Sequence, residues 1–279
     1  MIESYSKINL FLKILKKKKN GLHNLQSSVM LLDLYDLISV KIIKKKQDEI
    51  KFIGRFKKKI NYKSNSITKS LYILRKNRLI SKKKKYKIII NKKIPVFAGL
   101  GGGTSNAASL IKHFLKNNIN ERLMKIFEAE IGSDFRLFFY RHSFQKNLKK
   151  IIKFKKRYTF NFMLIYPNIN CSTKKVYSKV KKFSLPLKND LSKIRSKRKY
   201  LQFLQSEIND LQSIVEKKYP KIKKILNLLK IQKNCLFSRM TGSGSVCFGV
   251  FPNKNSAKLS MRALKKKFPD YCYIIAKSI

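Results

Sequence analysis

The sequence predicts an α+β protein with two domains, and three observations carry this prediction. The chain has 279 residues, of which 43% are hydrophobic, so it is long enough for two domains with a sizeable core. Its first half alternates strand-like with helix-like apolar periodicity. Its second half has the order β-α-β-β-α-β, which is typical of helices packed on an antiparallel sheet. We expect domains at 1–150 and 151–279, divided in a lysine-rich stretch without glycine.

Apolar spacing and turn residues define the expected elements. Apolar and polar side chains alternate along 8–15, as in a half-buried strand, and every second residue of 86–90 lies on one face of a strand that Pro95 ends. Apolar residues recur at helical spacing after Thr104 or Ser105, either of which suits an N-cap. The expected strands are 8–15, 28–43, 48–56, 86–93, 160–166, 235–239, 245–251 and 271–276; the expected helices are 66–78, 104–117, 121–131, 198–217, 220–231 and 255–267.

The charge of the chain suggests a nucleic-acid-binding protein, but its composition weakens that reading. Lys and Arg total 66 against 14 Asp and Glu, a formal charge of +52. Of these cations 55 are Lys and only 11 are Arg, the side chain whose fork binds phosphates and bases in bidentate fashion. Together with the abundant Ile and Asn, this favours a solvated lysine surface, and nucleic acid is not the expected partner.

Other global features point to a cytoplasmic protein with free thiols. The four cysteines have no metal-ligand spacing, and no apolar run reaches the roughly 18 residues of a membrane span. Lys7 and Lys13 interrupt the apolar N-terminal stretch, which has no small-residue cleavage site, so we expect neither a signal peptide nor a membrane partner. The sequence leaves the oligomeric state open.

Glycine placement carries the functional signal. Only ten glycines occur, and seven of them fall in the three segments PVFAGLGGGTS, IGSDF and MTGSGS. Such clusters mark backbone that needs a positive φ or a close approach to a ligand. The first segment lies between an expected strand and an expected helix, which aims backbone N–H groups and a helix N-terminus at one point and suits a phosphate. A Walker A loop is excluded because no Lys precedes Thr104, and a dinucleotide fingerprint fits weakly because no βαβ pattern surrounds it.

These motifs resemble those of the GHMP kinases. PVFAGLGGGTSNAAS is similar to their second motif, SYSKINLFLKI to their first, and MTGSGSVCFGVF to their third, in the same order along the whole chain. Within the family the sequence is most similar to members that carry AKxNLxL, DGYHxLxS and GADVPF. The resemblance implies a ribosomal-protein-S5-like N-terminal domain that binds ATP, and a ferredoxin-like C-terminal domain.

The resemblance also implies a phosphoryl transfer from ATP, with Mg²⁺, to the 2-hydroxyl of 4-diphosphocytidyl-2-C-methyl-D-erythritol in non-mevalonate isoprenoid synthesis. Asp134 would accept the hydroxyl proton, and Lys7 would orient the hydroxyl and stabilise negative charge. By itself Asp134 could equally be an N-cap. The metal ligands stay open, although Thr104 or Ser105 could supply a hydroxyl. The implied ATP-binding residues are Pro95, Val96, Phe97, Ala98, Gly99, Leu100, Gly101, Gly102, Gly103, Thr104 and Ser105.

Substrate recognition carries over from the family with two departures. The residues implied to contact the substrate are Asn9, His23, Thr173, Tyr177, Gly242, Ser243 and Gly244. Leu22 stands where the family has a Tyr, and Phe135-Arg136 replaces the Val-Pro that follows the catalytic Asp. These departures keep one alternative open, which is another GHMP kinase such as a homoserine kinase. The charge keeps open a second, a basic nucleic-acid-binding protein on the same fold.

Overall fold

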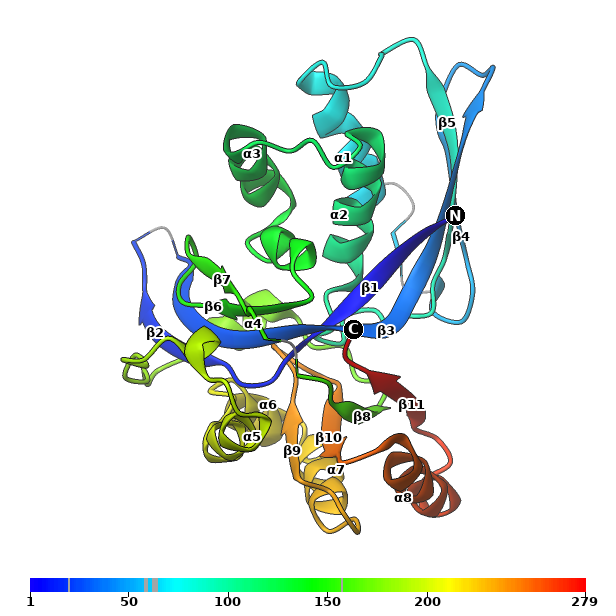
Figure 1. Ribbon diagram of the computed structural model, residues 1–279. Helices are drawn as coiled ribbons and strands as arrows, with labels where there is room; N and C mark the ends of the chain where they lie inside the picture. The colour runs from blue at the N-terminus through cyan, green and yellow to red at the C-terminus, as the bar shows by residue number, and fades with distance from the viewer. Residues whose placement is uncertain (20, 58–59, 62–64, 157) are drawn as a thin grey trace. The chain divides into compact units, whose positions relative to one another are not determined.

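The computed structural model describes residues 1–279 except 20, 58–59, 62–64 and 157, and it divides the chain into two compact units (Figure 1). Unit one consists of Met1–Ser6, Leu34–Val96 and Gly101–Phe139. Unit two consists of Lys7–Asp33, Phe97–Leu100 and Tyr140–Ile279. Both units therefore draw on the N-terminal half of the chain. None of the helices formed by the described residues has the length and apolar character needed to cross a membrane.

Unit one packs helices on a sheet that includes the second part of the long strand β3. β5 pairs antiparallel with β3 and parallel with β4. Tyr86, Ile88 and Ile90 of β5 are buried together with Leu71 and Leu110 from the helices, so the predicted inward face of this strand is confirmed. The elements are β3 (His23–Ile43), β4 (Glu49–Ile53), α1 (Ser66–Lys76), β5 (Lys85–Asn91), α2 (Gly102–Phe114), α3 (Glu121–Ile131) and the 3-10 helix η2 (Phe135–Phe139).

Unit two contains the predicted β-α-β-β-α-β arrangement. Its four-stranded antiparallel sheet has the order β11-β8-β10-β9, which is that of a ferredoxin-like fold. Helix α7 packs on β9 and β10, and helix α8 packs on β8, β10 and β11 (Figure 1). The elements are β8 (Asn161–Tyr166), α7 (Pro220–Lys230), β9 (Phe237–Met240), β10 (Cys247–Phe251), α8 (Lys254–Lys267) and β11 (Cys272–Lys277).

The rest of unit two surrounds the first part of β3, which pairs with β2 and β6. Strand β1 runs from unit one into unit two and also pairs with β3. Strands β6 and β7 and the short helix α4 have no counterpart among the predicted elements. These elements are β1 (Ile2–Asn9), β2 (Lys13–Lys17), β6 (His142–Gln145), β7 (Ile151–Lys153), α4 (Thr173–Tyr177), η3 (Leu191–Lys193), α5 (Lys197–Ser206) and α6 (Gln212–Lys218).

Two predicted elements are wrong for a shared reason. The strand predicted at 8–15 is broken, because β1 ends at Asn9 and β2 begins at Lys13; the helix predicted at 198–217 is broken between α5 and α6. The chain segments at the two breaks are hydrogen-bonded to each other. The Leu12 N–H donates to the Ile208 carbonyl at 3.1 Å, and the Asp210 N–H donates to the Leu12 carbonyl at 2.9 Å. The break around Leu12 is also fully buried, not half-buried as its alternation indicated.

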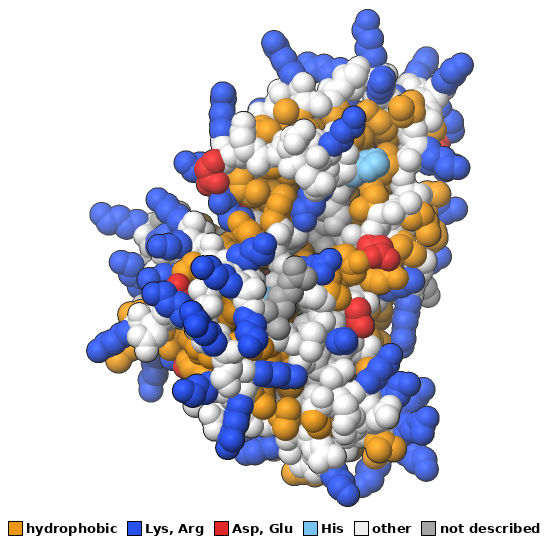
Figure 2. Space-filling model, in the orientation of Figure 1, with side chains coloured by type: hydrophobic (Ala, Val, Ile, Leu, Met, Phe, Trp, Pro, Cys, Tyr) orange, Lys and Arg blue, Asp and Glu red, His pale blue; other side chains and the backbone are white. Residues whose placement is uncertain are grey.

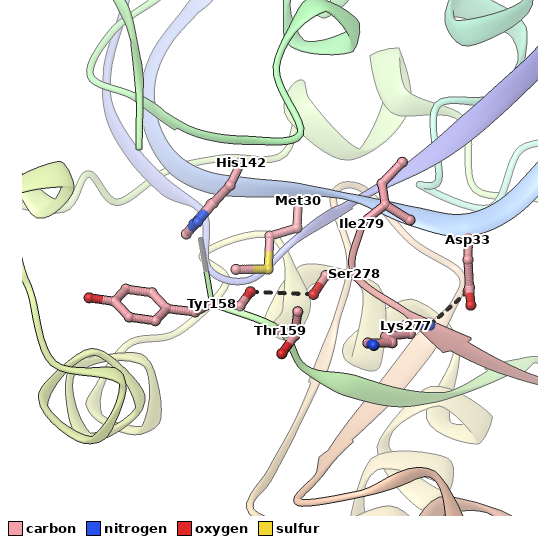
Figure 3. A pocket seen from close by; sticks show the side chains of 8 residues that line it. All are labelled: Met30, Asp33, His142, Tyr158, Thr159, Lys277, Ser278 and Ile279. Atoms are coloured by element: carbon pink, nitrogen blue, oxygen red, sulfur yellow. Dashed lines mark hydrogen bonds between the residues drawn. The ribbon is translucent and has the colours of Figure 1, made fainter. Parts of the chain in front are cut away.

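A cavity of about 310 Å³ in unit two has the buried His142 in its wall (Figure 3). The His142 ring stacks on Phe154 with centroids 3.6 Å apart, and its Nε2 lies 3.0 Å from the Tyr200 hydroxyl. Burial lowers the pKa of His142 to about 3. The cavity is lined by Met30, Asp33, His142, Tyr158, Thr159, Lys277, Ser278 and Ile279, and so by none of the predicted site residues.

The pKa of His142 predicts an acid-sensitive fold. In the unfolded chain the imidazole takes up a proton below about pH 6.5, whereas the folded protein resists protonation to about pH 3. The free energy of unfolding should therefore fall by up to about 1.4 kcal/mol per pH unit as pH decreases below 6.5. Denaturant unfolding of wild type and His142→Phe between about pH 5 and pH 8 tests this: the variant should lose most of that slope, and an equal slope in both would contradict the assignment.

Candidate active site

The end of β1 places a buried ammonium in unit two. Lys7 is 4% exposed and donates from Nζ to the Asn9 side-chain oxygen, while its backbone N–H donates to the Leu100 carbonyl at 3.0 Å. The Asn9 amide nitrogen in turn donates to the Ser27 hydroxyl at 2.8 Å. Of the 55 lysines, only Lys7 and Lys92 are buried among the residues that the structure describes. Lys7, the lysine of the first motif, thus differs from the exposed lysines by its burial.

The loop between β9 and β10 closes on Lys7 and Asn9. The Asn9 N–H donates to the Thr241 hydroxyl at 2.9 Å. A Cβ on Gly242 would lie 3.3 Å from the Asn9 side-chain oxygen and 3.4 Å from Lys7 Nζ, and the φ of +54° at Gly242 also favours glycine. The buried Asn209 side chain donates to the Gly242 carbonyl at 2.8 Å and so helps to fix the position of the loop. The sequence marked Thr241 as the first residue of the glycine loop 241–245 that the resemblance places over the substrates, whereas nothing in the sequence marked Asn209.

The first and third glycine segments of the sequence meet at Gly99. This residue has a φ of +80°, and a Cβ there would lie only 2.2 Å from the Thr241 carbonyl oxygen. The neighbouring Ala98 carbonyl accepts the Val246 N–H at 3.2 Å. Two loops far apart in the sequence are therefore in backbone contact, and glycine is required because no side chain fits between them.

The predicted substrate-binding residues of unit two also come together. The His23 and Tyr177 rings have centroids 5.3 Å apart, and the Thr173 hydroxyl lies 2.9 Å from the Ser243 hydroxyl. Burial, and secondarily the charge of Lys17, lowers the pKa of His23, so its imidazole is neutral at pH 7. Leu22, where the family has a Tyr, is half exposed beside it.

The last three glycines of the first segment, Gly101, Gly102 and Gly103, lie in unit one at the N-terminus of α2. The helix begins at Gly102 and its N-cap is Gly101, with a φ of +68° and no side-chain capping bond, so the prediction of Thr104 or Ser105 as N-cap is wrong. The Ser105 hydroxyl instead donates to the Tyr5 carbonyl at 2.6 Å. The glycine cap leaves the first-turn N–H groups without a capping side chain, which suits an anion such as a phosphate. Since the Ser105 hydroxyl is used within the fold, Thr104 is the better candidate for a hydroxyl ligand.

Asp134 lies in unit one, between Gly132 at the end of α3 and the 3-10 helix η2. The next two residues, Phe135 and Arg136, are those in which the sequence departs from the family, and both side chains are held by other parts of unit one. Phe135 is fully buried, with its ring 5.4 Å from that of Phe127. Arg136 donates to Glu128 at 2.7 Å and to Glu121 at 2.7 Å, and these bonds, that to Glu128 first, raise the pKa of Arg136. The departure thus fixes the backbone that presents Asp134.

A magnesium ion would find few protein ligands here. Across the described part of the chain, no group of three or more His, Cys, Asp or Glu side chains could hold a metal. Mg²⁺ commonly keeps several waters and binds through one or two protein groups together with substrate phosphates. The residues present therefore fit an ion that arrives with a nucleotide, not one held in a cage of side chains.

Comparison with known sequences agrees with the class of protein that the fold and this site define. The GHMP kinases N terminal domain matches residues 65–136, and the GHMP kinases C terminal domain matches residues 187–270. The chain belongs to the GHMP kinase family and is a small-molecule kinase.

Two relatives that match over nearly their whole length carry the same name. A 4-diphosphocytidyl-2-C-methyl-D-erythritol kinase of Pelagibacter ubique is 40% identical, covering 100% of this chain and 98% of that protein. The enzyme of the same name from Wolbachia pipientis wMel is 29% identical, covering 97% of this chain and 95% of that protein.

Solved structures agree on the fold. A crystal structure of 4-(cytidine 5'-diphospho)-2C-methyl-D-erythritol kinase matches with a TM-score of 0.77 at 20% identity, covering 99% of this chain and 97% of that one. The homoserine kinase from Cytophaga hutchinsonii matches with a TM-score of 0.62 at 16% identity, covering 98% of this chain and 94% of that one. The predicted two-domain GHMP kinase fold is confirmed.

The contact at Gly99 predicts a sharp contrast between two glycines of the same segment. Gly99→Ala should lower the free energy of unfolding by about 2–5 kcal/mol, because its Cβ meets the Thr241 carbonyl and its φ is left-handed. Gly103→Ala is the control: its Cβ would lie 3.8 Å from the Ser66 hydroxyl, within helix α2, where Ala is favoured by up to about 1 kcal/mol. Urea unfolding measures both, and equal effects would contradict the proposed contact.

Proposed function

We propose that this protein transfers the γ-phosphoryl group of ATP to the 2-hydroxyl of 4-diphosphocytidyl-2-C-methyl-D-erythritol, a step of non-mevalonate isoprenoid synthesis. The observation that carries the proposal is the buried Lys7–Asn9 pair under the Gly242 loop, in a chain 40% identical over its whole length to a relative named for this substrate. Phosphoryl transfer needs positioned groups and neutralised charge more than covalent chemistry, and a fixed ammonium supplies both.

Asp134 is proposed as the base and Lys7 as the orienting cation. Asp134 accepts the proton of the substrate hydroxyl as that oxygen attacks the γ-phosphorus, and Phe135 and Arg136 support it by anchoring the adjoining backbone. Lys7 donates to the attacking hydroxyl and stabilises the negative charge that develops on the transferred group. Its hydrogen bond to Asn9 supports this role because it holds the ammonium in one position.

The nucleotide is proposed to bind along Pro95–Ser105. The glycine N-cap of α2 leaves backbone N–H groups for the phosphate oxygens, and the positive end of the helix favours their charge. Mg²⁺, when bound with the nucleotide, neutralises phosphate charge, and Thr104 is the candidate hydroxyl ligand.

Cytidine recognition is proposed for His23, Thr173 and Tyr177, with Asn9, Gly242, Ser243 and Gly244 against the rest of the substrate. The close His23 and Tyr177 rings offer a stacking surface, and a neutral imidazole has one donor and one acceptor for a neutral base. The domain boundary near residue 150 and a cytoplasmic location also stay predictions.

Substituting the proposed catalytic residues should lower turnover by orders of magnitude in protein that still folds. Asp134→Asn removes the base and should lower kcat by about 10²–10⁴-fold. Lys7→Ala removes the stabilising cation and should lower kcat by about 10²–10³-fold. Coupled ADP release from Mg·ATP and 4-diphosphocytidyl-2-C-methyl-D-erythritol measures both.

The exposed Asp270→Asn is the matched control for removal of a carboxylate and should keep wild-type activity. Full activity in Asp134→Asn and Lys7→Ala would show that the residue roles are wrong. Folded wild type that releases ADP with homoserine, but not with the cytidine diphosphate substrate, would show that the substrate is wrong.

The lysine-rich surface predicts a salt-dependent capture of substrate. Lys and Arg side chains cover much of the face in Figure 2, with few acidic ones, and both proposed substrates are anions. Raising ionic strength from about 0.01 M to about 0.15 M shortens the Debye length from about 30 Å to about 8 Å. We expect kcat/KM to fall several-fold over this range while kcat changes little; a constant kcat/KM would contradict electrostatic steering.

A further inference from the structure

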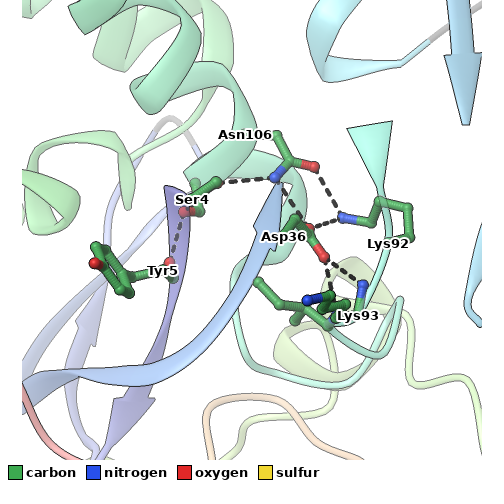
Figure 4. A network of polar contacts seen from close by, with 8 residues as sticks. Ser4, Tyr5, Asp36, Lys92, Lys93 and Asn106 are labelled. Atoms are coloured by element: carbon green, nitrogen blue, oxygen red, sulfur yellow. Dashed lines mark hydrogen bonds and ion pairs between the residues drawn. The ribbon is translucent and has the colours of Figure 1, made fainter. Parts of the chain in front are cut away.

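The second buried lysine, Lys92, belongs to a polar network inside unit one (Figure 4). Its ammonium, 3% exposed, donates to the fully buried Asp36 carboxylate and, at 2.8 Å, to the side-chain oxygen of Asn106. The Asn106 amide nitrogen donates to the same Asp36 carboxylate at 3.0 Å and to the Ser4 hydroxyl at 2.8 Å. The predicted roles for the glycine motifs use none of these side chains.

This network holds both ends of the glycine segment. The Lys93 and Ile94 N–H groups, just before Pro95, donate to Asp36 at 2.7 and 2.9 Å. Asn106 lies on α2, just after the segment, and bonds to the same carboxylate. A Cβ on Gly102, the first residue of α2, would lie 3.6 Å from Lys92 Nζ. One carboxylate therefore fixes where the chain enters the segment and where the helix that follows begins.

Stability alone does not account for a charged pair at this position. The desolvation cost of a buried ion pair often exceeds its Coulombic gain, and replacing such a pair with apolar side chains is commonly neutral or stabilising. The bonds of Asp36 and Asn106 have a geometric effect instead, because they tie backbone N–H groups and one face of α2 to fixed positions. That geometry matters at a phosphate site, where a displacement of about 1 Å can cost about 10²-fold in rate.

We propose that Asp36, Lys92 and Asn106 form a positioning network that fixes the first turn of α2 for the triphosphate of the nucleotide. The proposal rests on the proposed function, because it assigns the α2 N-terminus to ATP. The three side chains act through the backbone and do not touch the phosphates. They therefore set the affinity for Mg·ATP and leave recognition of the phosphoryl acceptor unchanged.

The double variant Asp36→Leu/Lys92→Met tests this directly, since it removes both charges and leaves neither one buried alone. We expect its KM for Mg·ATP to rise by at least about tenfold, with the KM for the phosphoryl acceptor within about twofold of wild type. Asn106→Ala keeps the ion pair but removes its link to α2, together with the bond from Asn106 to Ser4, and it should raise the KM for Mg·ATP about fivefold or more. Calorimetric binding of a non-hydrolysable ATP analogue, and urea unfolding, accompany the kinetics.

Asp48 and Arg75 provide the matched control within unit one. Arg75 donates to Asp48 at 2.9 Å and to the Lys84 carbonyl at 3.0 Å, and Asp48 also accepts the Tyr86 N–H at 2.9 Å, so the pair bonds to backbone at the start of β5. Asp48→Leu/Arg75→Met should alter stability without moving the KM for Mg·ATP.

The proposal is overturned if folded Asp36→Leu/Lys92→Met keeps a wild-type KM for Mg·ATP, or if both pairs change it equally. If the double variant does not fold, Asn106→Ala decides alone, and an unchanged KM in that variant overturns the proposal. Failure of the proposed function looks different, because wild type itself would then bind no ATP analogue.

Discussion

The site in unit two depends on backbone passing close to a buried ammonium. Lys7 is almost fully removed from solvent, and a buried cation persists only where polar groups surround it. Asn9 supplies one such group, and the Gly242 loop passes so close that a Cβ on Gly242 would lie 3.3 Å from the Asn9 side-chain oxygen and 3.4 Å from Lys7 Nζ. Gly99 allows a second close backbone contact, with the Thr241 carbonyl of the same loop. The glycines at 99 and 242 therefore let the segments around Lys7 and Leu100 and the β9–β10 loop pack closely together.

The described lysines of this chain fall into two groups, a large one that is at least partly exposed and the buried pair Lys7 and Lys92. Most of the 55 lysines give the protein its charge, and any effect they have on substrate capture acts at long range. Lys7 and Lys92 are held by amides and carboxylates inside their own units, and each ammonium lies near a glycine: a Cβ on Gly242 would lie 3.4 Å from Lys7 Nζ, and one on Gly102 would lie 3.6 Å from Lys92 Nζ. Close backbone approach and a fixed cation thus occur together at both places.

Much of the fold and part of the site could be predicted from the sequence, and the failures have physical causes. The β-α-β-β-α-β order of unit two and the inward face of β5 follow from local periodicity, whereas the ferredoxin-like fold and the choice of Lys7 come from the resemblance of the sequence motifs to those of the GHMP kinases. The breaks at Leu12 and Asn209 could not be predicted, because each forms only through pairing with a segment about two hundred residues away. Lys92 was missed because the neighbouring Lys93 looks the same in sequence, and the Lys92 side chain is distinguished by contacts with Asp36 and Asn106, which lie elsewhere along the chain.

Phosphorus NMR of the complete reaction is the decisive measurement for the proposed kinase activity, because it follows the transferred group itself. With ATP, Mg²⁺ and 4-diphosphocytidyl-2-C-methyl-D-erythritol, we expect a new phosphomonoester resonance that grows in step with ADP. Folded protein that leaves ATP unchanged, or that yields ADP with only inorganic phosphate, would contradict it.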